Sequence, residues 1–94
     1  MRRVTTLTFD TALEVLFQIF EITYIRLEPA WATKVVEELP HRSKVDVLAA
    51  IDMLFDLGFI EYDSGYMEKW RIGLLIYLVE KHVYKIEELY YEYE

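Results

Sequence analysis

The alternation of apolar and polar positions is clearest between Ser43 and Tyr62, where it predicts a capped helix that ends at a glycine and continues into a strand. Ser43 can accept a hydrogen bond from the backbone N–H of Asp46, whose carboxylate would lie at the positive end of the helix. Gly58 can adopt the left-handed conformation that ends a helix, and β-favouring residues follow it. The expected buried positions recur at three- and four-residue spacing: Val47, Leu48, Ile51, Leu54 and Phe55.

The preceding part of the chain predicts an N-terminal arm or strand over residues 1–10, because Val4, Leu7 and Phe9 alternate with polar residues. Thr11 and Glu14 form a capping-box pattern, so a helix is expected from Thr11 to about Ile25. Apolar residues nearly encircle this helix. It is therefore expected at the centre of the core or in a subunit interface.

A second helix is expected between Pro29 and Pro40, with Pro29 in its first turn and Pro40 ending it. Its buried stripe would consist of Trp31, Val35 and Leu39. Only a short connection separates Pro40 from the helix that follows Ser43. Two helices at this spacing are typical of a helix-turn-helix.

Beyond Gly58 the pattern favours a β-hairpin, with a strand at 59–62, a turn at Asp63-Ser64-Gly65 and a second strand at 66–72. A helix that begins near Ser64 is the alternative for this second arm. Gly73 would separate it from a last helix, from Leu74 to about Tyr91. The stripe on that helix is expected to form a dimer interface, with folding back on the first helix as the alternative; it comprises Val79, Val83, Ile86, Tyr90 and Tyr93.

Length and composition indicate one folded domain, with an arm at 1–10, a central part at 11–73 and a terminal helix at 74–94. Of the 94 residues, 54% are hydrophobic and 16% aromatic, which suggests that part of the surface is buried against a partner, most simply a second copy. The net charge of −7 disfavours non-specific attraction to phosphate backbones. No signal peptide or membrane-spanning segment is recognised, so a cytoplasmic location is expected.

The order of these elements resembles the winged helix-turn-helix superfamily. The similarity is carried by the second helix PAWATKVVEEL, the turn PHR, the third helix SKVDVLAAIDMLFDLG and the wing GFIEYDSGYMEKWRIG. It extends over most of the chain from Thr11 and looks most like small archaeal and archaeal-virus regulators of this fold, in which a last helix pairs two subunits. The resemblance implies a mainly α fold with a small β-hairpin wing and a C-terminal dimerisation helix.

The resemblance also implies that the third helix enters the DNA major groove while the wing touches the adjacent backbone or minor groove. Carried over by position, the DNA-binding residues would be Arg42, Ser43, Lys44, Ala49, Ala50, Lys69 and Arg71. Asp46, Glu61 and Asp63 depart from this pattern, because they place negative charge on the same surfaces. The sequence thus predicts a DNA-binding transcriptional regulator that acts as a homodimer. The alternative is an acidic winged-helix adaptor that binds protein and no DNA.

Enzymatic and metal-binding functions have little support in the sequence. No catalytic motif and no phosphate-binding glycine loop is present, and the chain has no cysteine. His41 and His82 are isolated and have no companion at metal-ligand spacing. We therefore expect neither an enzyme nor a bound cofactor or metal.

Overall fold

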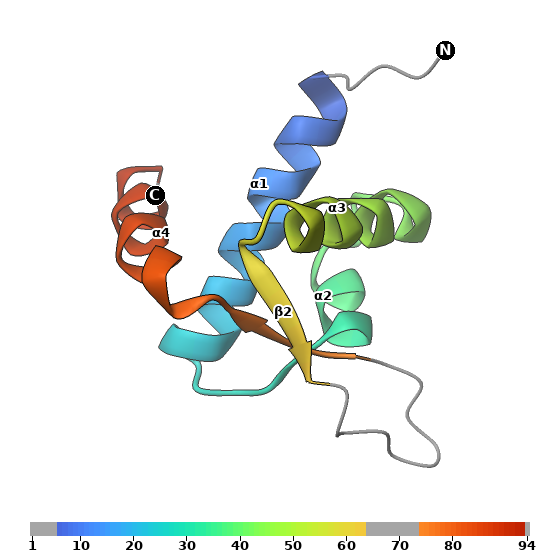
Figure 1. Ribbon diagram of the computed structural model, residues 1–94. Helices are drawn as coiled ribbons and strands as arrows, with labels where there is room; N and C mark the ends of the chain where they lie inside the picture. Colours follow the sequence, from blue (N-terminus) through green and yellow to red (C-terminus); the bar gives the residue numbers. More distant parts are fainter. Residues whose placement is uncertain (1–5, 64–73, 94) are drawn as a thin grey trace.

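The computed structural model describes residues 6–63 and 74–93, which form a mainly helical protein with a small three-stranded antiparallel sheet (Figure 1). The helices are α1 (Thr6–Phe20), its π-helical continuation η1 (Glu21–Ile25), α2 (Ala32–Glu38), α3 (Lys44–Asp56) and α4 (Glu80–Glu92). The strands are β1 (Ala30–Trp31), β2 (Ile60–Asp63) and β3 (Leu75–Leu78). The core contains buried side chains from α1, α2, α3, α4 and the sheet.

The first helix begins earlier than the sequence predicts. Thr6 to Asp10 are helical, so this part of the expected arm is wrong, while residues 1–5 lie outside the described part. Thr11 is buried inside α1 with 1% of its surface exposed and therefore does not cap the helix. A capping-box pattern is a local signal, and the packing of α1 against α3 overrides it here.

α1 continues without interruption into η1, in which the N–H of Arg26 donates to the carbonyl of Glu21 at 2.9 Å. This five-residue reach defines a π-helical turn. The turn places Ile22 fully in the core and ends at Ile25. Two residues later, Leu27 has a φ of 56°, in the left-handed region, although it is not a glycine. Leu27 is also 81% exposed, so its side chain contributes little to the core.

α2 starts three residues later than Pro29, because Ala30 and Trp31 are extended and pair with Ile76 and Leu75 of β3. The expected buried stripe is confirmed: Trp31, Val35 and Leu39. Leu39 leaves helical geometry with φ −124° and ψ 62°, as expected for the residue before a proline.

Both ends of α3 are as predicted. The Ser43 hydroxyl accepts a hydrogen bond from the N–H of Asp46 at 3.1 Å, and Gly58 has a φ of 84°. The buried face differs in part, because Ala50 is completely buried whereas Leu48 and Phe55 are 39% and 45% exposed. The buried face of α3 consists of Val47, Ala50, Ile51 and Leu54. At about 100° per residue, Leu48 and Phe55 lie at the edge of this face.

The sheet has the order β1-β3-β2, with β3 in the middle. β2 is confirmed as a strand, but its partner differs from the expected one: Tyr62 pairs with Ile76, not with a residue just after a three-residue turn. The predicted second arm at 66–72, with the turn residues Ser64 and Gly65, lies outside the described residues. The run Leu75–Leu78, expected as the start of the last helix, is strand β3, because periodicity alone does not distinguish a short buried strand from a buried helix.

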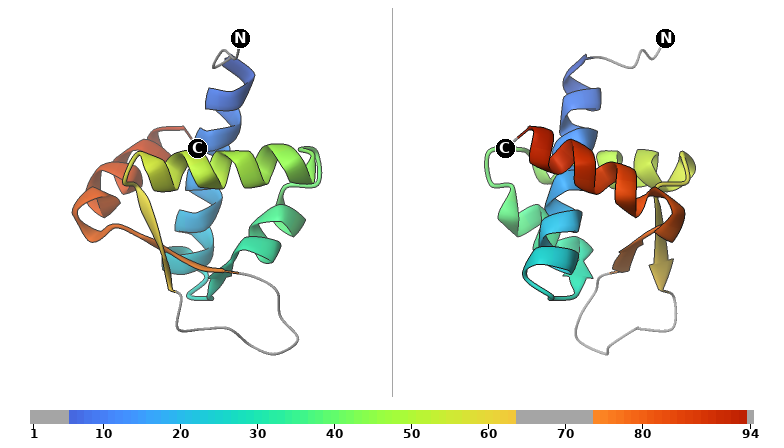
Figure 2. Two further views of the ribbon diagram at one scale, coloured as in Figure 1. Left: turned by 45° about the vertical axis from the view of Figure 1, so that its right-hand side comes forward. Right: turned by 90° about the vertical axis from the view of Figure 1, so that its left-hand side faces the viewer.

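α4 packs against α1 of the same chain (Figure 2). Ile86 is 1% exposed, and the Tyr90 ring lies 5.9 Å from Phe17 and 5.1 Å from Phe20. The Tyr90 hydroxyl donates to Glu21 at 3.1 Å. Most of the stripe expected in a dimer interface is thus occupied within the chain, as in the alternative of folding back. The terminal Tyr93 remains 67% exposed although its ring lies 5.8 Å from Phe17.

Candidate functional site

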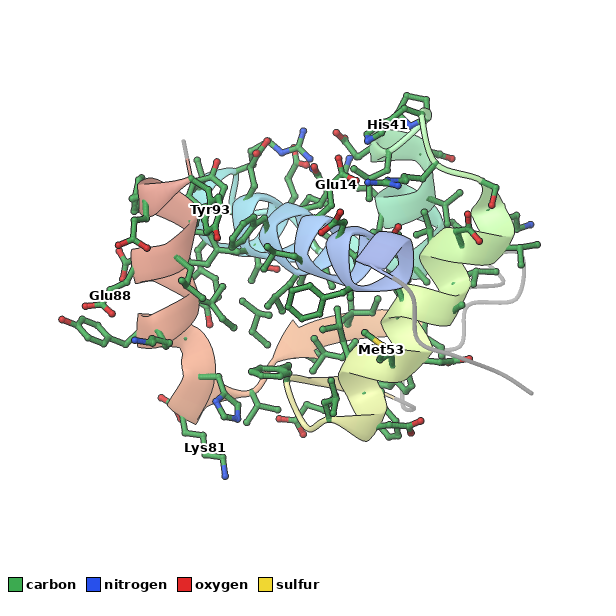
Figure 3. The ribbon with its side chains drawn as sticks, turned by 90° about the horizontal axis from the view of Figure 1, so that it is seen from above. Glu14, His41, Met53, Lys81, Glu88 and Tyr93 are labelled. Carbon is green, nitrogen blue, oxygen red and sulfur yellow. The ribbon has the colours of Figure 1, made fainter. Side chains whose placement is uncertain are left out.

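The turn between α2 and α3 is attached to the middle of α1 through one carboxylate. Glu14 Oε2 lies 2.6 Å from His41 Nε2, and Glu14 Oε1 accepts a hydrogen bond from Arg42 Nε at 2.8 Å. In Figure 3, the labelled Glu14 and His41 side chains lie next to each other between α1 and this turn. We call Glu14, His41 and Arg42 the Glu14 cluster. It fixes the start of α3 relative to α1.

The Glu14 cluster also determines the charge that Arg42 presents. Burial raises the pKa of the Glu14 carboxyl, but the hydrogen bonds and positive charges of Arg42 and His41 outweigh this effect and hold the pKa below its usual value. The Arg42 side chain is only 21% exposed. Its charge is therefore largely neutralised by Glu14 and is not directed outward toward a ligand.

The other predicted DNA-contacting residues are only partly brought together. The Ser43 hydroxyl already caps α3, while Lys44 and Ala49 are exposed on that helix. Ala50 has no exposed surface, so the expectation that its methyl group meets a base is wrong. Lys69 and Arg71 lie outside the described residues.

The outward face of α3 is apolar and acidic. We define the α3 outer face as its exposed residues other than Lys44: Val45, Asp46, Leu48, Ala49, Asp52, Phe55 and Asp56. Val45 is 75% exposed, and three carboxylates stand on this helix against one exposed lysine. The periodicity of this segment predicts Leu48 and Phe55 in the core, whereas both are exposed. The available signal was that α3 has more large apolar residues than a single buried face can hold.

The acidic end of the α3 outer face is linked to the sheet. The Phe55 and Tyr62 rings stack with centroids 4.5 Å apart and planes 9° from parallel, and the Tyr62 hydroxyl donates to Asp52 at 3.5 Å. Burial raises the pKa of Tyr62, and the charges of Asp52 and Asp56 and the Asp52 hydrogen bond raise it further. The carboxylates at this end therefore produce a negative local potential that extends to β2.

Two further observations concern other classes of site. Within residues 6–63 and 74–93, His, Asp and Glu side chains nowhere gather in groups of three that could hold a metal ion. The same part of the chain has no helix with the length and hydropathy needed to cross a bilayer. His82 packs against the Phe59 ring at 4.8 Å, and His41 belongs to the Glu14 cluster.

We compared the chain with protein-family models, with curated proteins and with solved structures, and none of the three comparisons found a match.

Proposed function

We propose that this protein is a winged-helix adaptor that binds another protein through the α3 outer face. The order α1-β1-α2-α3-β2-β3-α4 and the sheet order β1-β3-β2 support the winged-helix assignment. So does the short connection between α2 and α3, which places the capped start of α3 directly after the turn. In this architecture α3 is the helix that meets the ligand.

The composition of the α3 outer face carries the proposal. Val45, Leu48 and Phe55 are exposed. Covering them with another apolar surface would stabilise a complex by about 25 cal/mol per Å² of apolar area buried. A DNA groove lined with phosphates offers little such surface. A protein partner can cover these side chains and pair its own basic groups with the surrounding carboxylates.

The charge of α3 also opposes DNA binding. Affinity for a duplex comes largely from lysine and arginine side chains that neutralise phosphates and release counterions. On α3, Lys44 is the exposed basic residue, and the carboxylates of Asp46, Asp52 and Asp56 on the same helix would repel phosphates. Arg42, just before α3, is paired with Glu14. The partner that fits best is a protein with an apolar patch bordered by lysine or arginine.

Photo-crosslinking in the cells in which the protein naturally occurs tests the adaptor function. A photoreactive phenylalanine analogue at Val45 should crosslink to a protein, whereas the same analogue at Tyr84 should not. The two positions are matched, because Val45 is 75% and Tyr84 72% exposed and Tyr84 lies on α4. The specific product should disappear when Leu48→Asp is added. Crosslinking to nucleic acid from Val45, or equal products from both positions, would contradict the proposal.

The second candidate function is a DNA-binding regulator. The observation in its favour is the exposed Lys44 at the N-terminal end of α3, directly after the Ser43 cap. Fluorescence anisotropy with random duplex and with the DNA upstream of its own gene, at low and moderate salt, distinguishes the two functions. Tight binding that is lost in a folded Lys44→Ala variant would favour the regulator and overturn the adaptor.

A further inference from the structure

The N-terminal turns of α1 extend beyond the rest of the protein. In Figures 1 and 2 this end of α1 stands clear of α3 and α4 in all three views. Phe9, on this extension, is 59% exposed, and the neighbouring Asp10 is exposed as well. A large aromatic side chain next to a carboxylate is thus more than half exposed at this end of α1.

An apolar groove of about 210 Å³ lies directly beside this extension, between α1, α3 and α4. We call it the α1–α3–α4 groove. Its walls include Leu13 and Leu16, Met53 and Leu57, and Ile86 and Leu89. In Figure 3, Met53 lies on the side of α3 that faces α1. Leu57, at its edge, is 60% exposed, so the groove is open to solvent.

The few polar groups that line the groove differ in charge from those on the α1 extension. The groove contains His82 and Lys85 from α4, and Lys85 is 73% exposed and only weakly paired with Glu88 at 3.8 Å. The extension carries the carboxylate of Asp10. An aromatic group with an adjacent carboxylate therefore complements an apolar groove with an adjacent ammonium group.

We propose that the occupant of the α1–α3–α4 groove is Phe9 from a second copy of this chain, with Asp10 of each copy near Lys85 of the other. Phe9 itself borders the groove. In a two-fold symmetric pair each copy therefore offers its Phe9 to the groove of the other. Such an isologous contact closes on itself and gives a dimer. This interface shares only Ile86 with the α4 stripe and includes none of the α3 outer face.

The apolar character of the groove is consistent with the charge of the protein. Two chains of net charge −7 repel each other, so a dimer requires burial of apolar surface together with local charge pairing. The exposed aromatic ring of Phe9 and the apolar groove walls provide the apolar surface, and Asp10 with Lys85 provides the charge pair.

Sedimentation equilibrium of the full chain over a range of micromolar concentrations tests the proposal. We expect a reversible dimer for the wild-type protein and at least about a hundredfold weaker dimerisation for Phe9→Asp, because both aromatic anchors are lost. Tyr84→Asp is the control. It removes an aromatic ring that is 72% exposed and lies on the face of α4 opposite its buried stripe, so the dimer should remain intact. Circular dichroism melting must show that Phe9→Asp remains folded.

A charge exchange tests the geometry. Asp10→Lys and Lys85→Asp should each weaken the homodimer, because each creates two like-charged contacts. An equimolar mixture should form a heterodimer, since the lysine introduced at position 10 of one variant then meets the aspartate introduced at position 85 of the other. The second contact of this heterodimer retains the original pair. Failure of the mixture to associate better than either variant would overturn the proposed arrangement.

Other occupants of the groove give different results. A wild-type protein that stays monomeric at all concentrations overturns the proposal and leaves residues 1–5 of the same chain, or an apolar small molecule, as the occupant. A dimer that persists in folded Phe9→Asp also overturns it, because the two copies then meet elsewhere. If the analogue at Val45 gives no protein crosslink in the otherwise wild-type chain while the dimer forms as expected, only the adaptor function is contradicted.

Discussion

Replacing Glu14 with glutamine should destabilise the protein by about 1–1.5 kcal/mol. Glu14→Gln preserves size and one oxygen acceptor but removes the charge that binds both His41 and Arg42. Hydrogen bonds to charged groups contribute about 1.5–3 kcal/mol when shielded, whereas exposed ion pairs contribute about 0.2–1 kcal/mol. The Arg42 side chain is 21% and the His41 side chain 56% exposed, so we assign about 1 kcal/mol to the first contact and at most about 0.5 kcal/mol to the second.

Urea denaturation monitored by circular dichroism provides the free energy of unfolding. Glu88→Gln is the matched control, because Glu88 is 50% exposed and its contact with Lys85 is 3.8 Å long. This control should change the free energy of unfolding by less than about 0.5 kcal/mol. Equal effects of the two substitutions would refute the conclusion that the Glu14 cluster stabilises the start of α3.

The pH dependence separates the charge of Glu14 from its packing. The pKa of Glu14 in the folded state lies below its ordinary value of 4.5, so its charge stabilises the fold fully above that pH. As the pH falls through the lowered folded-state pKa, the carboxylate is protonated and this contribution is lost. The difference in stability between the wild type and Glu14→Gln should therefore shrink in acid. A difference that stays constant down to a pH well below 4.5 would show that the charge is not its cause.

Four further substitutions test the fold by the same denaturation assay. Gly58→Ala should cost about 1–2 kcal/mol, because the left-handed φ of 84° strains a side chain although no atom lies within 4 Å of the added Cβ; an unchanged stability would contradict this. Ile86→Ala should lower the free energy of unfolding by about 2–4 kcal/mol, because Ile86 is buried in the core. Val45→Ala should lower it by less than about 0.5 kcal/mol, because Val45 is exposed. Similar losses of stability for both variants would indicate that α4 is not part of the core. Leu27→Gly should stabilise the protein by up to about 1 kcal/mol by relieving the left-handed strain at φ 56°, and a loss of stability would show that the Leu27 side chain contributes to the fold.

Features governed by neighbouring residues were predictable from the sequence. The Ser43 cap, the Gly58 stop and the end of α2 before Pro40 each depend on the local chemistry of a few positions, and the structure has all three. The burial of Trp31, Val35 and Leu39 was also predicted correctly, although Trp31 lies in β1 and only Val35 lies within α2.

Features decided by contacts between distant residues were not predictable in this way. Leu75–Leu78 is a strand because β1 and β2 pair with it on both sides, and an apolar run alone is compatible with either structure. Of the candidate site, Lys44 and Ala49 are exposed as expected, but the exposure of Leu48 and Phe55 and the pairing of Arg42 with Glu14 depend on how α3 crosses α1. That crossing is a property of the packed fold, which residue spacing does not encode.

The π-helical turn at Glu21–Ile25 has a consequence for which changes in chain length this protein can tolerate. One residue corresponds to about 100° of rotation in a regular helix. Deleting a residue here would leave a smooth helix but turn the exit of the chain away from the position at which Ala30 pairs with Ile76. Because Ile25 is half-exposed, we expect a change of its side chain to matter less than a change in the number of residues between Phe20 and Ala30.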